Sequence, residues 1–93
     1  MRHAFALALT LVFAASAASA ECYADYKAKQ DGPLRLHYGV MEVPESACSP
    51  GAAGPIVADR LRDGWTLLNI VSVFGPDGLE QRRASAGPYF LRY

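Results

Sequence analysis

Two cysteines, Cys22 and Cys48, constrain the fold of this chain more than any other feature. Both follow an N-terminal segment, residues 1–20, that has the pattern of an export signal, so the folded part is expected to be residues 21–93. A domain of this size gains only about 3 to 5 kcal/mol from its core. Closing the loop 22–48 with a disulfide contributes roughly 3 to 4 kcal/mol, nearly as much. We therefore predict one Cys22–Cys48 disulfide in a single small domain.

Three other uses of the cysteines are alternatives to this bond. They are an intermolecular link, free or redox-active thiols, and a lipid on Cys22. The Cys-x-x-Cys spacing of many oxidoreductases is missing, and Glu21 stands where lipoprotein signals need a small residue. Zinc would need two further ligands, for which only His37 and carboxylates are at hand.

The export segment is built in three parts. Residues 1–3 are short and positively charged, residues 4–20 are uncharged and largely apolar, and the small Ala18 and Ala20 fit a signal peptidase site. We expect cleavage before Glu21 and a periplasmic or secreted protein of bacterial type. A retained membrane anchor is the weaker alternative, because the run is at the short end of what spans a bilayer and is rich in alanine and serine.

The charge balance argues against several classes of partner. The chain has nine Lys and Arg residues and nine Asp and Glu residues, and removing the signal with Arg2 leaves a slight negative excess. The basic pairs Lys27 with Lys29 and Arg82 with Arg83 are too few to track a phosphate backbone. We expect no nucleic-acid partner, and no membrane anchor once the signal is removed.

Hydrophobic patterning predicts four strands. Residues 23–30 form a mediocre strand whose charges indicate an edge or half-exposed position. After a turn at 31–33, apolar residues alternate with others over 34–41, which predicts an amphipathic strand and a hairpin. Residues 65–74 carry no charge and several β-branched side chains, so they are expected to form a central strand. Residues 89–93 read as a final strand.

Helical signals lie between these strands. Residues 44–51 are rich in breakers and predict a loop tethered by the disulfide. A helix follows, with Pro55 in its first turn and Gly64 ending it, although Ser49 could cap an earlier start. Residues 79–84 have modest helical character. We predict an α+β fold: a small antiparallel sheet of three to four strands with one helix packed on one face, ββαββ-like, and one disulfide.

A short pattern in the second half resembles a known family. It consists of a helix that leads to Gly64, then Trp65, an apolar strand, and the closing residues 90–93. This is similar to the small bacterial domains of unknown function grouped as family 4177, whose hallmark is a helix, Gly-Trp-Glu-Leu-Val and a final strand ending in a basic residue. Thr66 and Leu68 replace the Glu and the Val here. The resemblance implies a ββαββ-like sheet with one helix across it and implies no activity.

Gly64 and Trp65 are expected to have a structural role. Glycine tolerates the left-handed conformation that turns a chain sharply after a helix. Trp65 then buries a large ring between helix and sheet, which contributes about 3 to 5 kcal/mol relative to alanine. Ligand binding by Trp65 is the alternative.

His37 is the one candidate for a general base in residues 21–93. The strand alternation predicts that it is solvated, on the face opposite its apolar neighbours. Catalysis would need a carboxylate such as Asp25 and a nucleophile such as Ser72 or Ser85 close by, and nothing local supports either. The remaining paired carboxylates are expected to be solvated rather than catalytic or metal-binding: Glu42 with Glu45, and Asp59 with Asp63. We expect no catalytic, cofactor or metal site.

A binding role is favoured by elimination. Tyr23, Tyr38, Tyr89 or Tyr93 could form a partly exposed patch, and an edge strand could accept a partner strand or pair two copies. We therefore expect an exported domain of unknown biochemical function, a monomer or homodimer. Its expected role is that of a non-catalytic binding or structural component of the cell envelope, with an unknown protein or small-molecule partner. The alternative is a small hydrolase-like enzyme that uses His37 with a carboxylate.

Overall fold

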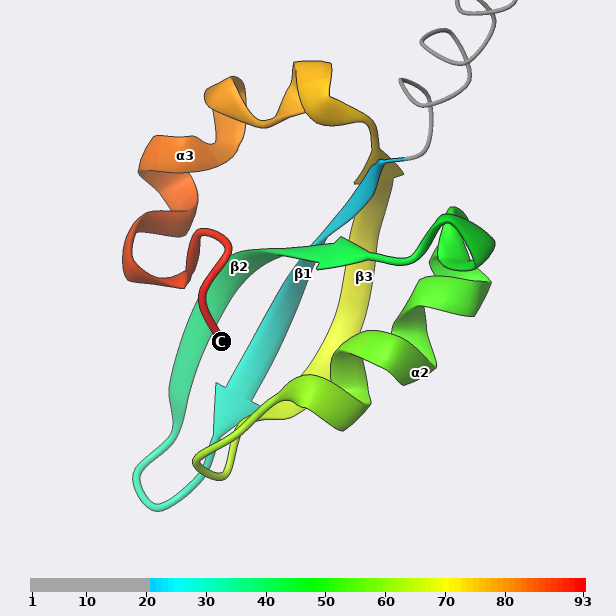
Figure 1. Cartoon of the computed structure of the whole chain (residues 1–93). Helices are drawn as coiled ribbons and strands as arrows, with labels where there is room; N and C mark the ends of the chain where they lie inside the picture. Colours follow the sequence, from blue (N-terminus) through cyan, green and yellow to red (C-terminus); the bar gives the residue numbers. More distant parts are fainter. Residues whose placement is uncertain (1–20) are drawn as a thin grey trace, which may run out of the picture.

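The structure is a computed structural model that describes residues 21–93, so the predicted export signal lies outside the described residues. The described chain forms a three-stranded antiparallel sheet with two helices, which confirms the α+β class (Figure 1). In chain order the elements are β1 (Cys22–Gln30), β2 (Arg35–Val43), the 3-10 turn η1 (Glu45–Ala47), α2 (Pro50–Arg60), β3 (Thr66–Phe74), the 3-10 turn η2 (Pro76–Gly78), α3 (Glu80–Ala86) and the 3-10 turn η3 (Gly87–Tyr89).

The strand order is β2-β1-β3, with both neighbours antiparallel to β1. The predicted edge position of β1 is therefore wrong. That prediction rested on the charges of the strand, but Asp25 is buried and bonded within the protein. Lys27 lies farther along the strand and is exposed. The small Ala24 and Ala28 are fully buried, so the opposite face of β1 admits a helix.

The apolar strand β3 lies at an edge rather than at the centre. Its pairing with β1 shifts twice, and at each shift β3 carries one residue that has no partner, Leu68 and Val71. Such β-bulges twist an edge strand and re-aim its side chains. Leu68 and Val71 are 50% and 47% exposed. The run reads as a central strand because its apolar composition does not reveal that the bulges turn two of its side chains outward.

The predicted strand over 89–93 is replaced by η3 and one isolated parallel bridge, Val40 with Phe90. The amide of Leu91 donates to the carbonyl of Val40 at 2.8 Å. Gly87, with φ of 52°, and Pro88 begin a tight turn, so the chain reaches β2 too late to form a ladder. The C-terminal segment instead lies against the outer edge of β2 (Figure 1).

The helix α2 begins earlier than the position of Pro55 predicts. Ser49 caps it by accepting a hydrogen bond from the amide of Ala52 at 3.3 Å, so the alternative start is the observed one. Pro55 consequently lies inside the helix. The helix ends at Arg60 rather than near Gly64, and Gly64 then turns the chain into β3 with φ of 82°.

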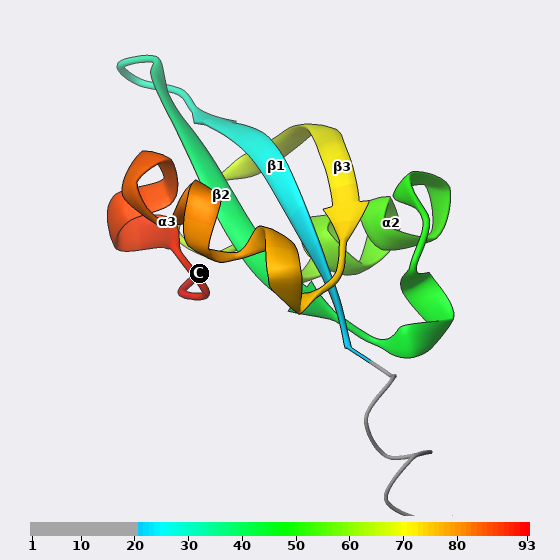
Figure 2. The same cartoon turned by 90° about the horizontal axis from the view of Figure 1, so that it is seen from above.

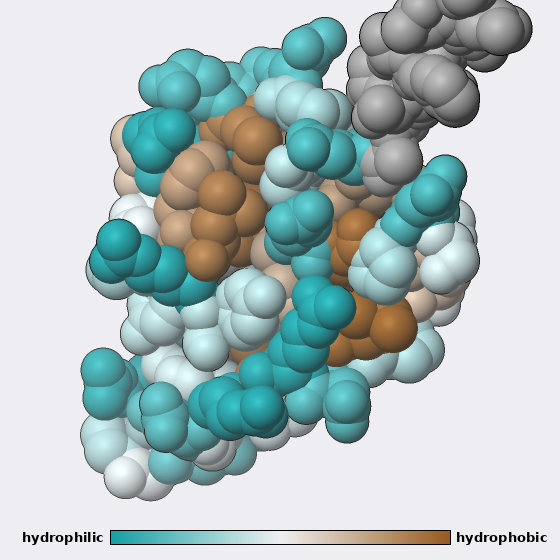
Figure 3. All heavy atoms as spheres, in the orientation of Figure 1, coloured by the Kyte–Doolittle hydropathy of each residue, from teal (hydrophilic) through white to brown (hydrophobic). Residues whose placement is uncertain are grey.

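The two helices cover opposite faces of the sheet, whereas the sequence predicted one helix on one face (Figures 1 and 2). One core contains Ala24, Tyr26, Ala28, Met41, Val43, Ala47, Ala53 and Val57, with α2 packed on the sheet. The other contains Tyr23, Val40 and Ala86, with Phe74, Leu79 and Phe90 packed against them. In Figure 3, hydrophobic residues reach the surface in two areas, one beside α3 and one beside α2.

The Cys22–Cys48 disulfide is formed, as predicted, with 5.7 Å between the Cα atoms. It ties the start of the central strand to the loop that precedes α2. A formed disulfide is typical of an oxidising compartment outside the cytosol. Within residues 21–93, no helix is long and apolar enough to cross a membrane.

Reducing this bond should lower the stability substantially. We expect the reduced protein to lose about 3 to 4 kcal/mol of unfolding free energy, because the open loop regains chain entropy in the unfolded state. Urea denaturation of the oxidised and reduced forms measures the difference. The double variant Cys22→Ala, Cys48→Ala should be insensitive to reductant, and equal stability of the two native forms would contradict this expectation.

Candidate functional site

His37 lies on the face of the sheet that α2 covers, paired with Ala28 of β1, and is not solvated as predicted. Its ring stacks on Tyr89, with the centroids 3.7 Å apart, and meets the edge of Trp65 at 4.2 Å. Nε2 lies 3.3 Å from the hydroxyl of Tyr26. Nδ1 is buried and has no hydrogen-bond partner among the described residues. The prediction failed because Trp65 and Tyr89, which cover the ring, are remote in sequence.

These surroundings do not favour a catalytic base. Burial lowers the pKa of His37, so the neutral imidazole is favoured. Its only hydrogen-bonding group among the described residues is a phenol, and Asp25 lies on the other face of the sheet with Ser72 bonded to it. Ser85 lines a separate hollow beside α3. The structure thus does not bring together the side chains that the hydrolase alternative requires.

Tyr26 shapes the His37 side of the sheet through a close approach to Gly39. The two residues are paired across β1 and β2, and Tyr26 is fully buried. A Cβ atom at position 39 would lie 2.5 Å from the Tyr26 hydroxyl oxygen and 2.6 Å from Cζ. Burial raises the pKa of Tyr26 to about 12, so it remains a neutral phenol. Glycine at position 39 therefore makes room for the ring that contacts His37.

Replacing Gly39 by alanine should displace the Tyr26 ring. We expect Gly39→Ala to lower the unfolding free energy by about 1 to 3 kcal/mol, as overpacking of a close-packed core does. Equilibrium denaturation followed by Trp65 fluorescence measures it. Gly54→Ala is the matched control: nothing lies within 4 Å of its Cβ position in α2, so it should stabilise by up to about 1 kcal/mol. Equal effects of the two substitutions would contradict this account.

Asp25 anchors α3 to the opposite face. Its side chain accepts three hydrogen bonds, from Ser72 Oγ at 2.7 Å, from the Tyr38 hydroxyl at 2.7 Å and from Arg82 Nε at 3.1 Å. Arg82 also donates to the carbonyl of Gly78 and lies over the Phe74 ring at 3.9 Å. Each of β1, β2, β3 and α3 supplies one member of this network. Sequence reasoning missed that Arg82 would supply the cation, because α3 brings it to Asp25 from a distant part of the chain.

The charge state of the network follows from these bonds. Burial alone raises the pKa of the Asp25 carboxyl, but its three donors and the positive charge of Arg82 lower it by more, to below the ordinary 3.8. Burial and the hydrogen bond donated to Asp25 raise the pKa of Tyr38 to about 12. Asp25 is therefore an anion and Tyr38 a neutral donor at neutral pH. This is a structural ion pair rather than a site poised for proton transfer.

Removing the Asp25 charge should destabilise the protein strongly. We expect Asp25→Asn to lower the unfolding free energy by about 3 kcal/mol, because Arg82 would be left without its anion. The matched control is Asp31→Asn, which breaks the exposed Lys29–Asp31 pair and should change stability by less than about 1 kcal/mol.

The pH dependence of the same variant gives a second measurement. The pKa of Asp25 is lower in the folded state than in the unfolded state. The stability that the ionised carboxyl contributes is therefore complete above about pH 3.8, and it is lost as the pH falls through the pKa of the folded state. The difference in unfolding free energy between the native protein and Asp25→Asn, measured by denaturation, should therefore become smaller below that pH. A gap that stays constant down to pH 2 would contradict the ion pair.

The face of the sheet that carries Asp25 has a second feature, a surface that α3 leaves uncovered toward the hairpin. A hollow of about 290 Å³ lies there, lined by Lys27, Leu36, Tyr38 and Leu68, and it also touches Ala28 and His37. We call Lys27, Leu36, Tyr38 and Leu68 the open surface. Leu36 is 66% exposed. Lys27 forms no ion pair with any residue of the described chain. The open surface is apolar with one free cation, and Tyr38 also lines the adjoining hollow beside α3.

The other predicted residues have ordinary places. Trp65 is half-buried against the α2 core. Of the four tyrosines expected to form an exposed patch, Tyr23 is buried and Tyr93 is exposed, while Tyr38 and Tyr89 are half-buried, so they do not form that patch. Within residues 21–93, no group of three or more His, Cys, Asp or Glu side chains could hold a metal ion.

Comparisons with protein-family models, with curated proteins and with solved structures find no match to this chain. The resemblance to family 4177 at Gly64 and Trp65 stays a prediction.

Proposed function

We propose that the protein is an exported, non-catalytic binding domain of the bacterial cell envelope, and that its open surface binds an acidic, apolar segment of another protein. The observation that carries the proposal is the exposure of Leu36 and Leu68 on either side of Lys27. The disulfide supports a periplasmic or secreted location.

Exposing leucine side chains to water lowers the stability of so small a domain unless a partner covers them. Apolar surface rimmed by polar groups is typical of protein-binding sites. Leu34, which is 64% exposed, extends the apolar area into the hairpin turn.

The charges at this end of the sheet specify the sign of the partner's charge. Lys27 and Arg35 are exposed, and Lys29 pairs with Asp31. On the same face, the Asp25 carboxylate is 3% exposed and already bonded to Arg82. A carboxylate set between two apolar side chains would therefore meet Lys27 without repulsion.

The geometry also specifies the order of those side chains. Leu36, Lys27 and Leu68 lie on three adjacent strands, so a peptide that crosses the strands meets them in this order. In an extended peptide, side chains two residues apart point the same way. The sequence Ser-Leu-Ser-Glu-Ser-Leu-Ser thus presents a carboxylate between two leucines on one side.

We expect this peptide to shift the amide resonances of Lys27, Leu36 and Leu68 in NMR titrations of the 15N-labelled protein. Peptides with Lys in place of Glu, or Ser in place of both Leu, should bind about tenfold more weakly. Lys27→Glu should reverse the preference between the Glu and Lys peptides, whereas Arg92→Glu, the same charge change elsewhere on the surface, should not. Equal binding of all three peptides, or of none, would refute the proposal.

The hydrolase alternative is not favoured by any contact of His37. Its ring is covered by Tyr89 and Trp65. Among the described residues, its hydrogen-bonding group is the hydroxyl of Tyr26 and not a carboxylate.

A further inference from the structure

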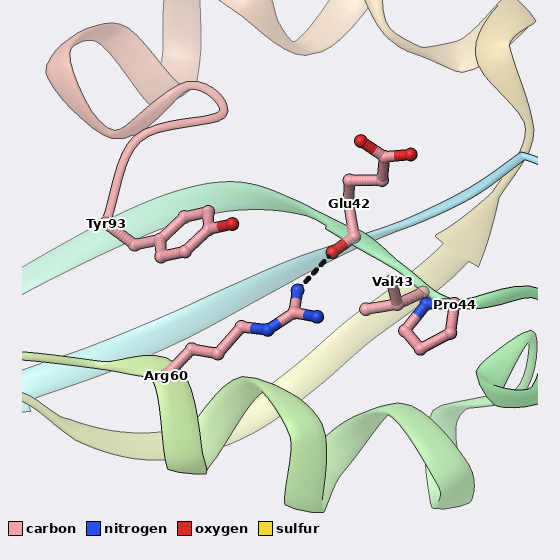
Figure 4. A pocket seen from close by; sticks show the side chains of 5 residues that line it. All are labelled: Glu42, Val43, Pro44, Arg60 and Tyr93. Atoms are coloured by element: carbon pink, nitrogen blue, oxygen red, sulfur yellow. Dashed lines mark hydrogen bonds between the residues drawn. The ribbon is translucent and has the colours of Figure 1, made fainter.

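A separate hollow of about 270 Å³ opens at the outer edge of β2, between the end of α2 and the last residues of the chain (Figure 4). It is smaller than the 300 to 1,000 Å³ that is typical of sites for drug-sized ligands, so it suits a small molecule. It shares no residue with the open surface, and the following inference is independent of the proposed function. Its lining consists of Glu42, Val43, Pro44, Arg60 and Tyr93.

Arg60 is held in place but keeps most of its donors. It is half-buried at the last position of α2, and its Nη1 donates to the backbone carbonyl of Glu42 at 2.7 Å. A guanidinium has five N–H donors, and this bond fixes the head group while using one of them. Arg60 forms no ion pair with any carboxylate of residues 21–93. A fixed guanidinium without an anion favours a carboxylate ligand, which it can bind with two parallel hydrogen bonds.

Glu42 and Tyr93 complete the polar lining. Figure 4 shows the Glu42 carboxylate turned away from the Arg60 guanidinium, while the Tyr93 hydroxyl points toward the space beside both residues. Glu42 and Arg60 both line this hollow, and they form no ion pair with each other. Val43 and Pro44 supply an apolar wall at its other end.

We propose that this hollow binds a free α-amino acid with a small apolar side chain. The carboxylate of the ligand accepts hydrogen bonds from Arg60 and the Tyr93 hydroxyl, its ammonium group donates to Glu42, and its side chain contacts Val43 and Pro44. A simple anion is disfavoured because Glu42 would repel it, and a simple cation because Arg60 would. Only a zwitterion satisfies both charges of the lining.

Three related probes test the requirement for both charges. L-valine carries both, N-acetyl-L-valine lacks the ammonium charge, and L-valine methyl ester lacks the carboxylate. In NMR titrations of the oxidised, 15N-labelled protein we expect L-valine to shift the amides of Val43, Arg60 and Tyr93, and each analogue to bind at least about tenfold more weakly. Equal binding of an analogue, or no binding of L-valine, would overturn the proposal.

Matched variants assign the charges to residues. Glu42→Gln keeps the backbone carbonyl that Arg60 contacts, so it preserves the fold while it removes the ammonium partner. It should weaken L-valine binding by about tenfold and leave N-acetyl-L-valine unaffected or bound more tightly. Arg60→Met should weaken the binding of both L-valine and N-acetyl-L-valine, because both ligands carry a carboxylate.

The controls are Glu45→Gln and Arg62→Met, which change exposed charges that do not line the hollow. Neither should alter binding. If Glu42→Gln binds L-valine as well as the native protein does, the amino-acid assignment is wrong, whether or not the open surface binds its peptide.

Discussion

The structure depends on the burial of β1 on both faces. A central strand in so short a chain must be covered twice, and its two faces are built for different partners. The face with Ala24 and Ala28 is thin, so α2 can approach closely, whereas the face with Tyr23 and Asp25 is covered by α3 through an apolar cluster and an ion pair. The disulfide fixes the first residue of the same strand to the loop before α2. These contacts fix the positions of α2, α3 and the loop before α2 relative to β1.

The helices leave two parts of the sheet uncovered, and these are the surfaces that we propose as binding sites. The helix α3 lies near Asp25 and leaves Leu36 and Leu68 exposed beside Lys27. At the outer edge of β2, the carbonyls of Val40 and Glu42 are capped by the Leu91 amide and by Arg60. This blunts an edge that would otherwise accept another strand, and it creates the hollow at Arg60.

Several elements could be predicted because their causes are local. The turn after residue 30, the strand pattern over 34–41 and the glycine turn at Gly64 follow from the preferences of adjacent residues. The strand order was missed because it depends on whether charges such as Asp25 find partners, which composition does not show. The exposure of His37 was mispredicted for the same reason, since strand alternation assumes one solvated face and here Trp65 and Tyr89 cover it. The final strand was mispredicted because a turn at Gly87–Tyr89 leaves only one bridge, between Val40 and Phe90, in place of a ladder.

The sequence by itself determined the disulfide, the α+β class and the approximate positions of three strands and two helical segments, because these depend on residue types and short-range periodicity. Only the tertiary structure decided that β1 is central, that two bulges turn Leu68 and Val71 outward, and that Arg82 neutralises Asp25. It likewise decided that Glu42, Arg60 and Tyr93 border one hollow. These features join residues that are distant in the chain, and their energies arise from burial and charge pairing that exist only after the chain has folded.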